Sequence, residues 1–427
     1  MKLYALVATM LVLVFAENNP AKSEMQISGG IGYDYISSDY YLLTADTLSI
    51  TPDSVEQLKR TSEAVNEMLL IGRVRYEHRF SDQFKLDIYN RTTYSEQALR
   101  NYLDFGIHYG SFRLENYFSF KQNNSAEIDN EESFSQDYIT NQTSARFRPH
   151  LGSGFYLGVK NSYEFTRYDN PGGYYYDFSY NKLDFTFEKE FGLDGRISFG
   201  YRNDLKKVTD STRLEYDRNI VMLYAEYSPS YNLRMELDNR YSSKNSKKEG
   251  SLDDEKLEDL QIVLDYQPSA LISLRFYNQF EYITYDSQDI VYYDQIYLRS
   301  EFEAEFTLTN ELEFSLTPHY RNLSAFEDEF SDQDYVEYSL EPGFSYMAIS
   351  GNLWVDFSFE FGRRDYSQDD VDFFSDHVLY QLNLLFDLNL FDRLNLYLLG
   401  AVDWQRHENK QDNSTLYLLS SAIEYSF

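Results

Sequence analysis

Polar and apolar residues alternate along almost the whole chain with a period of two. In the stretch MLLIGRVRYEHRF, for example, Leu70 and Val74 alternate with Arg73 and Arg75. An extended strand sends such a pattern to two opposite faces, whereas a helix with a period of 3.6 mixes it. The chain is therefore predicted to consist of β-strands with one apolar and one polar face.

The composition agrees with an all-β chain. Aromatic residues make up 18% of the sequence, with 41 Tyr and 32 Phe, and these residues favour strands. A mean hydropathy of -0.55 excludes a bundle of membrane helices. The absence of Cys excludes disulfides and thiolate metal sites. We expect no cofactor and no metal.

The charge narrows the range of partners. The chain carries 70 acidic and 38 basic residues, a formal net charge of -32. Phosphate binding requires a basic surface, so a nucleic-acid partner is not expected.

The first residues have the pattern of an export signal. Lys2 precedes an apolar run from Leu3 to Phe15. Val14, Phe15 and Ala16 have the small or apolar side chains that suit signal peptidase. We predict cleavage after Ala16, which leaves residues 17–427 as a single domain. The alternative, an anchor helix, is disfavoured because the run is shorter than the ~20 apolar residues that a bilayer span needs.

The strands are expected to form hairpins with two kinds of connection. Short turns rich in Gly, Asn, Asp and Ser, such as those at Gly110 and Ser111, alternate with long acidic stretches such as NLSAFEDEFSDQD. Counting the segments predicts about 20 strands, with 18 to 22 within error. The alternation of short turns and long loops separates a membrane barrel from a soluble sandwich or solenoid, the alternative architectures.

One long connection contains a predicted helix. In residues 51–68, Thr51 is placed to cap the helix and Pro52 falls at its first position. A helix on an outer loop is favoured over one that folds inward and constricts the barrel.

The two ends of the chain carry strands that can close a ring. The last residues, LYLLSSAIEYSF, place Leu419, Ile423, Tyr425 and Phe427 on one face, with Tyr417 extending the series and Ser421 departing from it. The first strand, QISGGIGYDY, is the natural partner for this last strand. Closure matters because only a closed barrel leaves no unpaired backbone group in hydrocarbon.

With this terminal pattern, the chain resembles bacterial outer-membrane β-barrel proteins of the porin-like kind. The resemblance implies a transmembrane antiparallel up-and-down barrel in the outer membrane, with short periplasmic turns and longer extracellular loops. It implies that the barrel-assembly machinery reads Leu419, Ile423, Tyr425 and Phe427. It also implies contact with lipid and lipopolysaccharide, and a homotrimer or a periplasmic or extracellular partner as open alternatives.

If one face of the strands is in lipid, the other lines the lumen, and it is densely charged. The early strands are expected to present Arg73, Arg75, Arg79, Lys85, Arg113, Arg146, Arg148 and Lys160. The later strands are expected to present Glu301, Glu303, Glu305, Glu313, Glu341, Asp356, Glu360 and Asp387. In a ring of this size a positive wall would face a negative wall and orient dipolar solutes. The alternative is local neutralisation, for example of Arg299 by Glu301 or of Arg275 by Glu281.

These features favour a channel for passive diffusion of small hydrophilic solutes or ions. The alternative is a sheath or secretion conduit that holds or passes a redox protein or a polysaccharide; without Cys, any haem carrier would be a separate chain. An enzyme is not expected, because the Ser375–His377 sequence SDH lies near a loop and sequence proximity is not triad geometry. The acidic loop clusters at Asp253–Glu255 and Asp328–Asp334 match no calcium-loop spacing.

Overall fold

The structure, a computed structural model, describes most of the chain. The residues described are 23–44, 57–96, 98–123, 137–169, 176–192, 194–209, 214–247, 254–286, 288, 292–368, 375–390, 393–407 and 413–426. The predicted signal peptide, residues 1–16, and Phe427 at the predicted assembly signal lie outside this part.

Nearly all of the described chain is strand, as the period-two alternation predicts. The strands are β1 (Ser23–Thr44), β2 (Gln57–Ser81), β3 (Phe84–Tyr94), β4 (Ala98–Tyr109), β5 (Phe112–Asn123), β6 (Tyr138–Phe147), β7 (His150–Gly152), β8 (Phe155–Tyr168), β9 (Phe178–Phe191), β10 (Gly195–Val208), β11 (Tyr216–Ser230), β12 (Leu233–Ser246), β13 (Glu255–Ser269), β14 (Ile272–Tyr285), β15 (Gln295–Thr309), β16 (Leu312–Ala325), β17 (Tyr335–Met347), β18 (Leu353–Tyr366), β19 (His377–Leu390), β20 (Leu394–His407) and β21 (Ser414–Ser426). A 3-10 helix, η3, covers Asp328–Gln333. No described helix is long and apolar enough to span a membrane.

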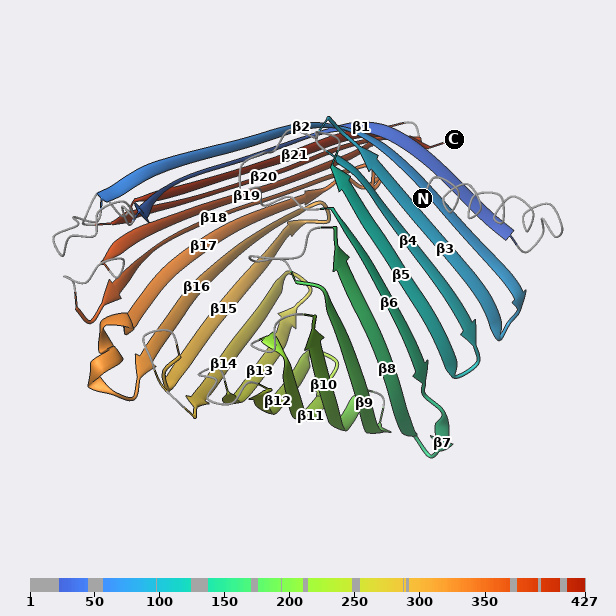
Figure 1. Ribbon diagram of the computed structural model, residues 1–427, viewed down its shortest axis with the longest axis horizontal. Helices are drawn as coiled ribbons and strands as arrows, with labels where there is room; N and C mark the ends of the chain where they lie inside the picture. Colours follow the sequence, from blue (N-terminus) through green and yellow to red (C-terminus); the bar gives the residue numbers. More distant parts are fainter. Residues whose placement is uncertain are drawn as a thin grey trace.

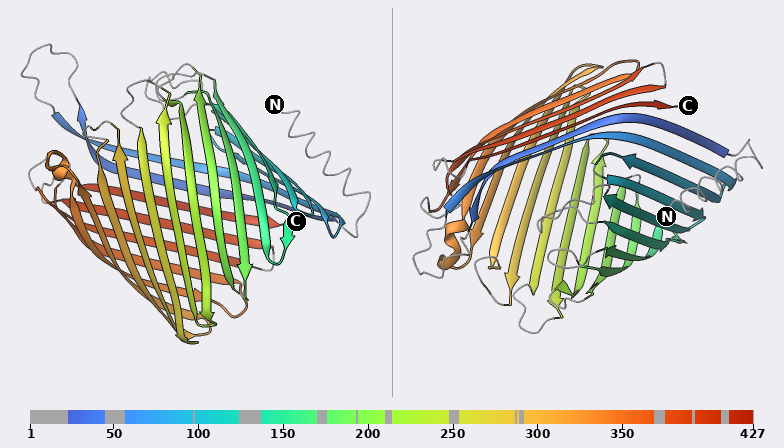
Figure 2. Two further views of the ribbon diagram at one scale, coloured as in Figure 1. Left: turned by 90° about the horizontal axis from the view of Figure 1, so that it is seen from below. Right: turned by 45° about the horizontal axis from the view of Figure 1, so that its top comes forward.

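The strands form one closed antiparallel barrel. Each strand pairs with its neighbours in sequence, and β1 also pairs with β21, which closes a ring of 20 strands. The extra strand, β7, is a three-residue piece that pairs with β8 inside the β6–β8 turn. Figures 1 and 2 show the strands strongly tilted, so that β8–β15 on one wall cross the direction of β19–β21 and β1–β2 on the other. The predicted fold class and strand number are confirmed.

The two rims differ as the turn pattern predicts. Short turns join β2 to β3 at residues 82–83, β4 to β5 at 110–111 and β15 to β16 at 310–311. Connections such as 124–137 and 326–334 at the opposite rim are longer. The three residues between β3 and β4 are the exception on that rim.

The helix predicted within residues 51–68 is wrong for its described part. From Gln57 onward these residues belong to β2, which pairs with β1 as far as Thr44 opposite Gln57. β3 begins to pair with β2 only at Leu70. The local helix signals are therefore overridden by backbone pairing with β1, and residues 57–69 form the outer half of a β1–β2 arm that extends beyond β3. Residues 51–56 lie outside the described part.

Glycine allows the first and last strands to approach closely. A Cβ atom added to Gly30 would overlap the Ile423 carbonyl oxygen of β21, and one added to Gly32 would lie 3.0 Å from the Ser421 carbonyl oxygen. Gly30 and Gly32 are register partners of Glu424 and Ala422. The predicted pairing of the first and last strands is thus confirmed, and it depends on positions without side chains.

Candidate functional site: the inner wall of the barrel

Alternate residues of each strand occupy the two faces of the barrel wall. In β2, Met68 and Leu70 are 59% and 58% exposed, whereas Leu69 and Ile71, which alternate with them, are both 7% exposed. Leu69 and Ile71 line an inner cavity together with charged residues, while the outward set across the barrel is rich in exposed Phe, Tyr, Leu and Ile. The outward face is therefore an apolar band suited to lipid, and the inward face carries the charges.

Six basic side chains follow one another across neighbouring strands of the inner wall. The register pairs Arg79 with Lys85, Lys85 with His108, His108 with Arg113, Arg113 with Arg146, and Arg146 with Lys160. We call these residues the basic row. Directly opposed like charges destabilise a sheet, so the basic row does not contribute to the stability of strand pairing. His108 was not singled out from the sequence, because only the strand register places it between Lys85 and Arg113.

The basic row is neutralised at one end and not at the other. Lys85 Nζ lies 2.9 Å from Glu77 and 2.6 Å from Asp87, and Arg113 pairs with Glu115. Arg146 and Lys160 are exposed to the lumen and have no hydrogen bond or ion pair with any described residue. Local pairing and an open positive surface therefore coexist on the same row.

Arg148, at the short-turn rim next to the basic row, is held in place. Its guanidinium lies 2.6 Å from Glu188 and 4.4 Å from the ring centroid of Tyr156. Its charge is consequently matched by a carboxylate and spread over an aromatic face.

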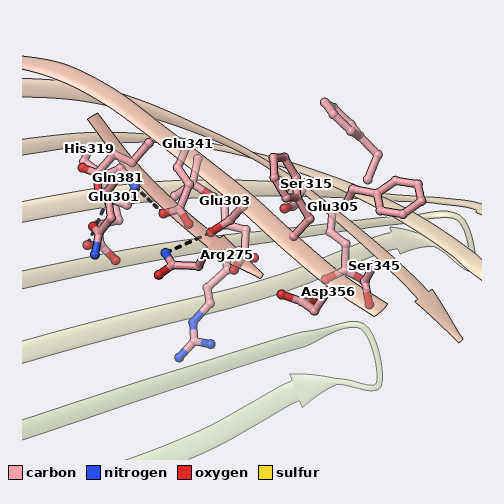
Figure 3. A pocket seen from close by; sticks show the side chains of 18 of the residues that line it. Arg275, Glu301, Glu303, Glu305, Ser315, His319, Glu341, Ser345, Asp356 and Gln381 are labelled. Carbon is pink, nitrogen blue, oxygen red and sulfur yellow. Dashed lines mark hydrogen bonds and ion pairs between the residues drawn. The ribbon is translucent and has the colours of Figure 1, made fainter. Parts of the chain in front are cut away.

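The acidic side chains of the later strands gather in one hollow of the wall. A cavity of about 870 Å³ is lined by residues of β14 to β19, and we call it the acidic recess (Figure 3). It contains seven of the eight acidic residues predicted for the lumen: Glu301, Glu303, Glu305, Glu313, Glu341, Asp356 and Glu360. Glu303, Glu305, Glu313 and Asp356 form no ion pair with any residue that the structure describes.

The eighth acidic residue, Asp387, lies elsewhere. It lines a second inner cavity of about 620 Å³ at the closing seam, with Arg73 and Arg91. Arg73 is 2.5 Å from Glu424 of the last strand, so its charge is matched across the seam. Arg75 follows two residues later on the same face and has no ion pair among the described residues.

The acidic recess and the basic row stand on opposite walls. β4 and β15 are ten strands apart in either direction around the ring, as Figure 1 shows by their places on opposite sides. Of the two mixed pairs considered above, Arg299 does pair with Glu301. The pair of Arg275 with Glu281 is wrong, because Arg275 lies opposite Asp265 and Glu303 in register and its guanidinium is 3.6 Å from Asp265.

A buried ion network lies behind the acidic recess. Glu337 on β17 is 1% exposed and accepts hydrogen bonds from Arg321 of β16 and Arg364 of β18. His319 lies between Glu301, 3.1 Å from its Nδ1, and Glu341, 3.2 Å from its Nε2. These groups are not visible as a unit in the sequence, because four strands, β15 to β18, contribute them at register positions.

The histidines do not assemble a catalytic triad with Asp376. Ser375 Oγ is 2.8 Å from His407 Nδ1, but Asp376 accepts from the Tyr366 amide at 2.7 Å and from Arg363 at 3.0 Å. His377 Nδ1 faces the Ser375 carbonyl. The expectation that the chain is not an enzyme stays a prediction.

Described carboxylates of the acidic loop clusters have structural roles. Asp254 accepts the Ser246 amide, Glu255 is 2.8 Å from Arg218, and Asp334 accepts the Ala325 amide at 2.6 Å. Asp253 lies outside the described residues. Tyr293, in the loop before β15, is 5% exposed and stacks on Phe330 of η3 at a centroid distance of 5.4 Å.

A closed barrel with an apolar outer band and a charged interior is a transmembrane β-barrel of the outer-membrane class, because strands satisfy all of their backbone groups in lipid only when the sheet is closed. The chain is an outer-membrane protein of porin-like architecture. No protein-family model matches it, and no curated protein matches it in sequence.

Solved structures share this architecture at low sequence identity. The iron transporter FrpB of Neisseria meningitidis is 9% identical over 97% of this chain and 83% of its own, with a TM-score of 0.59. The alcaligin outer-membrane receptor FauA of Bordetella pertussis is 11% identical over 93% of this chain and 76% of its own, with a TM-score of 0.57. OpdQ of Pseudomonas aeruginosa is 10% identical over 94% of this chain and 97% of its own, at a TM-score of 0.47. The first two likenesses support the fold and not a particular solute.

Proposed function

We propose that the protein is an outer-membrane channel through which small hydrophilic solutes or ions diffuse passively. The observation that carries the proposal is the division of the inner wall into the basic row on β2–β8 and the acidic recess on β14–β19. A wall that served only to be solvated would need no such separation of like charges, which opposes the pairing of neighbouring strands.

The separated charges give the lumen a transverse field. Unpaired cations at Arg146 and Lys160 face unpaired carboxylates such as Glu303 and Glu305 across the ring. Within a low-dielectric wall such a field favours ions and dipolar solutes over apolar ones. We place the channel lining at the residues predicted from the sequence, with Asp387 and Arg73 at the seam as the least exposed to the field, because Arg73 is held by Glu424.

Single-channel recording of the refolded full chain in planar bilayers tests this function. A stable ohmic current with a reversal potential that responds to charge changes on the wall is expected. The absence of current would refute passive diffusion. Silence together with a partner that co-purifies from outer membranes would instead favour a conduit, for which the β1–β2 arm beyond β3 offers a surface.

A further inference from the structure

Three neighbouring strands of the acidic recess bring one imidazole and two carboxylates together. His319 lies on β16, Glu341 on β17 and Glu360 on β18, and one ligand atom of each lies within 4.8 Å of the others. His319 and Glu360 are buried, and Glu341 is partly exposed to the recess. Some point therefore lies within about 2.8 Å of all three atoms, a distance slightly longer than the contacts that oxygen and nitrogen ligands make to divalent cations.

The two nitrogens of His319 face different carboxylates. Nε2 is hydrogen-bonded to Glu341 at 3.2 Å. Nδ1 is 3.1 Å from Glu301 Oε1, which lies away from the N–H direction, so that this buried nitrogen has no well-aligned hydrogen bond. Glu301 is itself fixed by Arg299. A carboxylate behind one ring nitrogen commonly orients the other toward a metal.

The fixed charges around His319 do not balance. The cluster holds four carboxylates, Glu301, Glu337, Glu341 and Glu360, and three guanidinium groups, Arg299, Arg321 and Arg364. One more positive charge is required, and either a proton on His319 or a bound cation supplies it. The unpaired carboxylates of the recess lie between this cluster and the short-turn rim and attract cations to it.

The sheet is interrupted beside the same residues. Pro318 precedes His319 and Pro342 follows Glu341, and proline in the middle of a sheet removes a backbone donor. No β15–β16 pair forms between Glu301–His319 and Ala304–Leu316, although the register is the same on both sides. No β17–β18 pair forms between Leu340–Phe361 and Gly343–Ser358, the segment that contains Glu341 and Glu360, and the register is again the same on both sides. The interrupted pairing lets the side chains close by the short distance that coordination requires.

We infer that His319, Glu341 and Glu360 form a binding site for a divalent transition-metal ion in the lumen wall. One imidazole with two carboxylates suits Zn²⁺, Mn²⁺ or Fe²⁺, and the face toward the recess leaves positions for water or solute. Glu301 acts as a positioning residue behind Nδ1. The inference stands apart from conduction, because binding to the wall requires no current.

Calorimetric titration tests the site on the full chain, refolded in detergent, freed of metal with a chelator and titrated with ZnCl₂ or MnCl₂. We expect one saturable site per barrel. His319→Gln, Glu341→Gln and Glu360→Gln should each weaken it by at least about 10-fold. Glu313→Gln is the matched control, because it removes the same charge from the recess without touching the cluster and should leave the affinity within about 2-fold.

X-ray absorption at the zinc edge of the loaded wild-type protein supplies a readout that needs no variant. Scattering from one imidazole and from oxygen ligands is expected, and oxygen ligands alone would overturn the assignment. No saturable site, unchanged affinity in His319→Gln, or an equal loss in Glu313→Gln would also overturn it, the last by showing general attraction to an acidic surface. Heat-modified migration in gels confirms that each variant is folded.

Discussion

The two charged walls of the barrel manage like charges in opposite ways. The basic row is open to the lumen, and Arg146 and Lys160 at one end have no described ion-pair partner. Behind the acidic recess, Glu337 is 1% exposed and is held between Arg321 and Arg364. Water stabilises Arg146 and Lys160, and counter-charges stabilise Glu337. The difference indicates that the unpaired end of the basic row is available to solutes, whereas the buried network supports the wall.

Of the substitutions that test this difference between the walls, the largest effect, a loss of folding stability, is expected at Glu337. Glu337→Gln removes a fully buried carboxylate from between the partly buried Arg321 and Arg364 and leaves both guanidinium groups with one charge partner fewer, so we expect a loss of about 3–5 kcal/mol in the free energy of unfolding. Urea unfolding in detergent micelles, followed by tryptophan fluorescence, measures the loss. Glu115→Gln is the control on the other wall, where the pair with Arg113 is exposed and is worth about 0–1 kcal/mol. Equal losses in both variants would remove the distinction between the walls.

Ion selectivity should change next most. Arg146→Glu combined with Lys160→Glu replaces two unpaired cations on the lumen wall, and the ratio of cation to anion permeability should rise by at least about 2-fold. Reversal potentials under a KCl gradient measure this ratio. Arg167→Glu combined with Lys256→Glu makes the same change in net charge on the outward face of β8 and β13 and should leave the ratio unchanged. If both double variants shift it equally, net charge and not the wall sets selectivity.

The reversal of Arg73 and Arg75 is expected to have a smaller effect on selectivity. Arg73 is matched by Glu424 across the closing seam. Arg73→Glu replaces this ion pair by repulsion between two carboxylates, so it acts mainly on stability. Arg75→Glu alone should shift the reversal potential in the same direction as the basic-row variant. The two single variants, compared in bilayers and in urea, separate these effects. A larger selectivity shift from Arg73→Glu than from Arg75→Glu would contradict the pairing at the seam.

The smallest effect is expected at high pH in the loop above the acidic wall. Burial, with help from nearby Asp334 and Asp332, raises the pKa of Tyr293 from 10.0 to about 12. The folded state thus favours the neutral phenol, and this contribution to stability is complete below pH 10 and is lost as the pH rises toward 12. Between these values, wild type should lose stability relative to Tyr293→Phe in urea unfolding. Parallel pH dependence of the two proteins would show that Tyr293 titrates normally.

The sequence was sufficient for the architecture because a single physical rule governs it. Each strand must send alternate residues to lipid and to water, so the face on which each residue of β2 lies can be assigned from its position in the sequence. The helix predicted within 51–68 failed because its propensity signals are local, whereas pairing with β1 is not. On the inner wall, too, some features could be predicted from the sequence and others could not. Charged residues could be assigned to the lumen from alternation, but the meeting of His319, Glu341 and Glu360 depends on the register of three strands. A shift of one residue would abolish it.

The seam between β1 and β21 also has a consequence for the order of synthesis and assembly. Gly30 and Glu424 are among the most distant positions of the chain, yet they are direct partners in the wall. The first strand therefore has a free edge from the time it leaves the ribosome until the last strand has been made and delivered. A chain shortened by β21 alone would present two unsatisfied edges to lipid instead of a slightly smaller barrel. Such a chain gains little from partial completion, because one edge of β1 stays unpaired until the ring is closed.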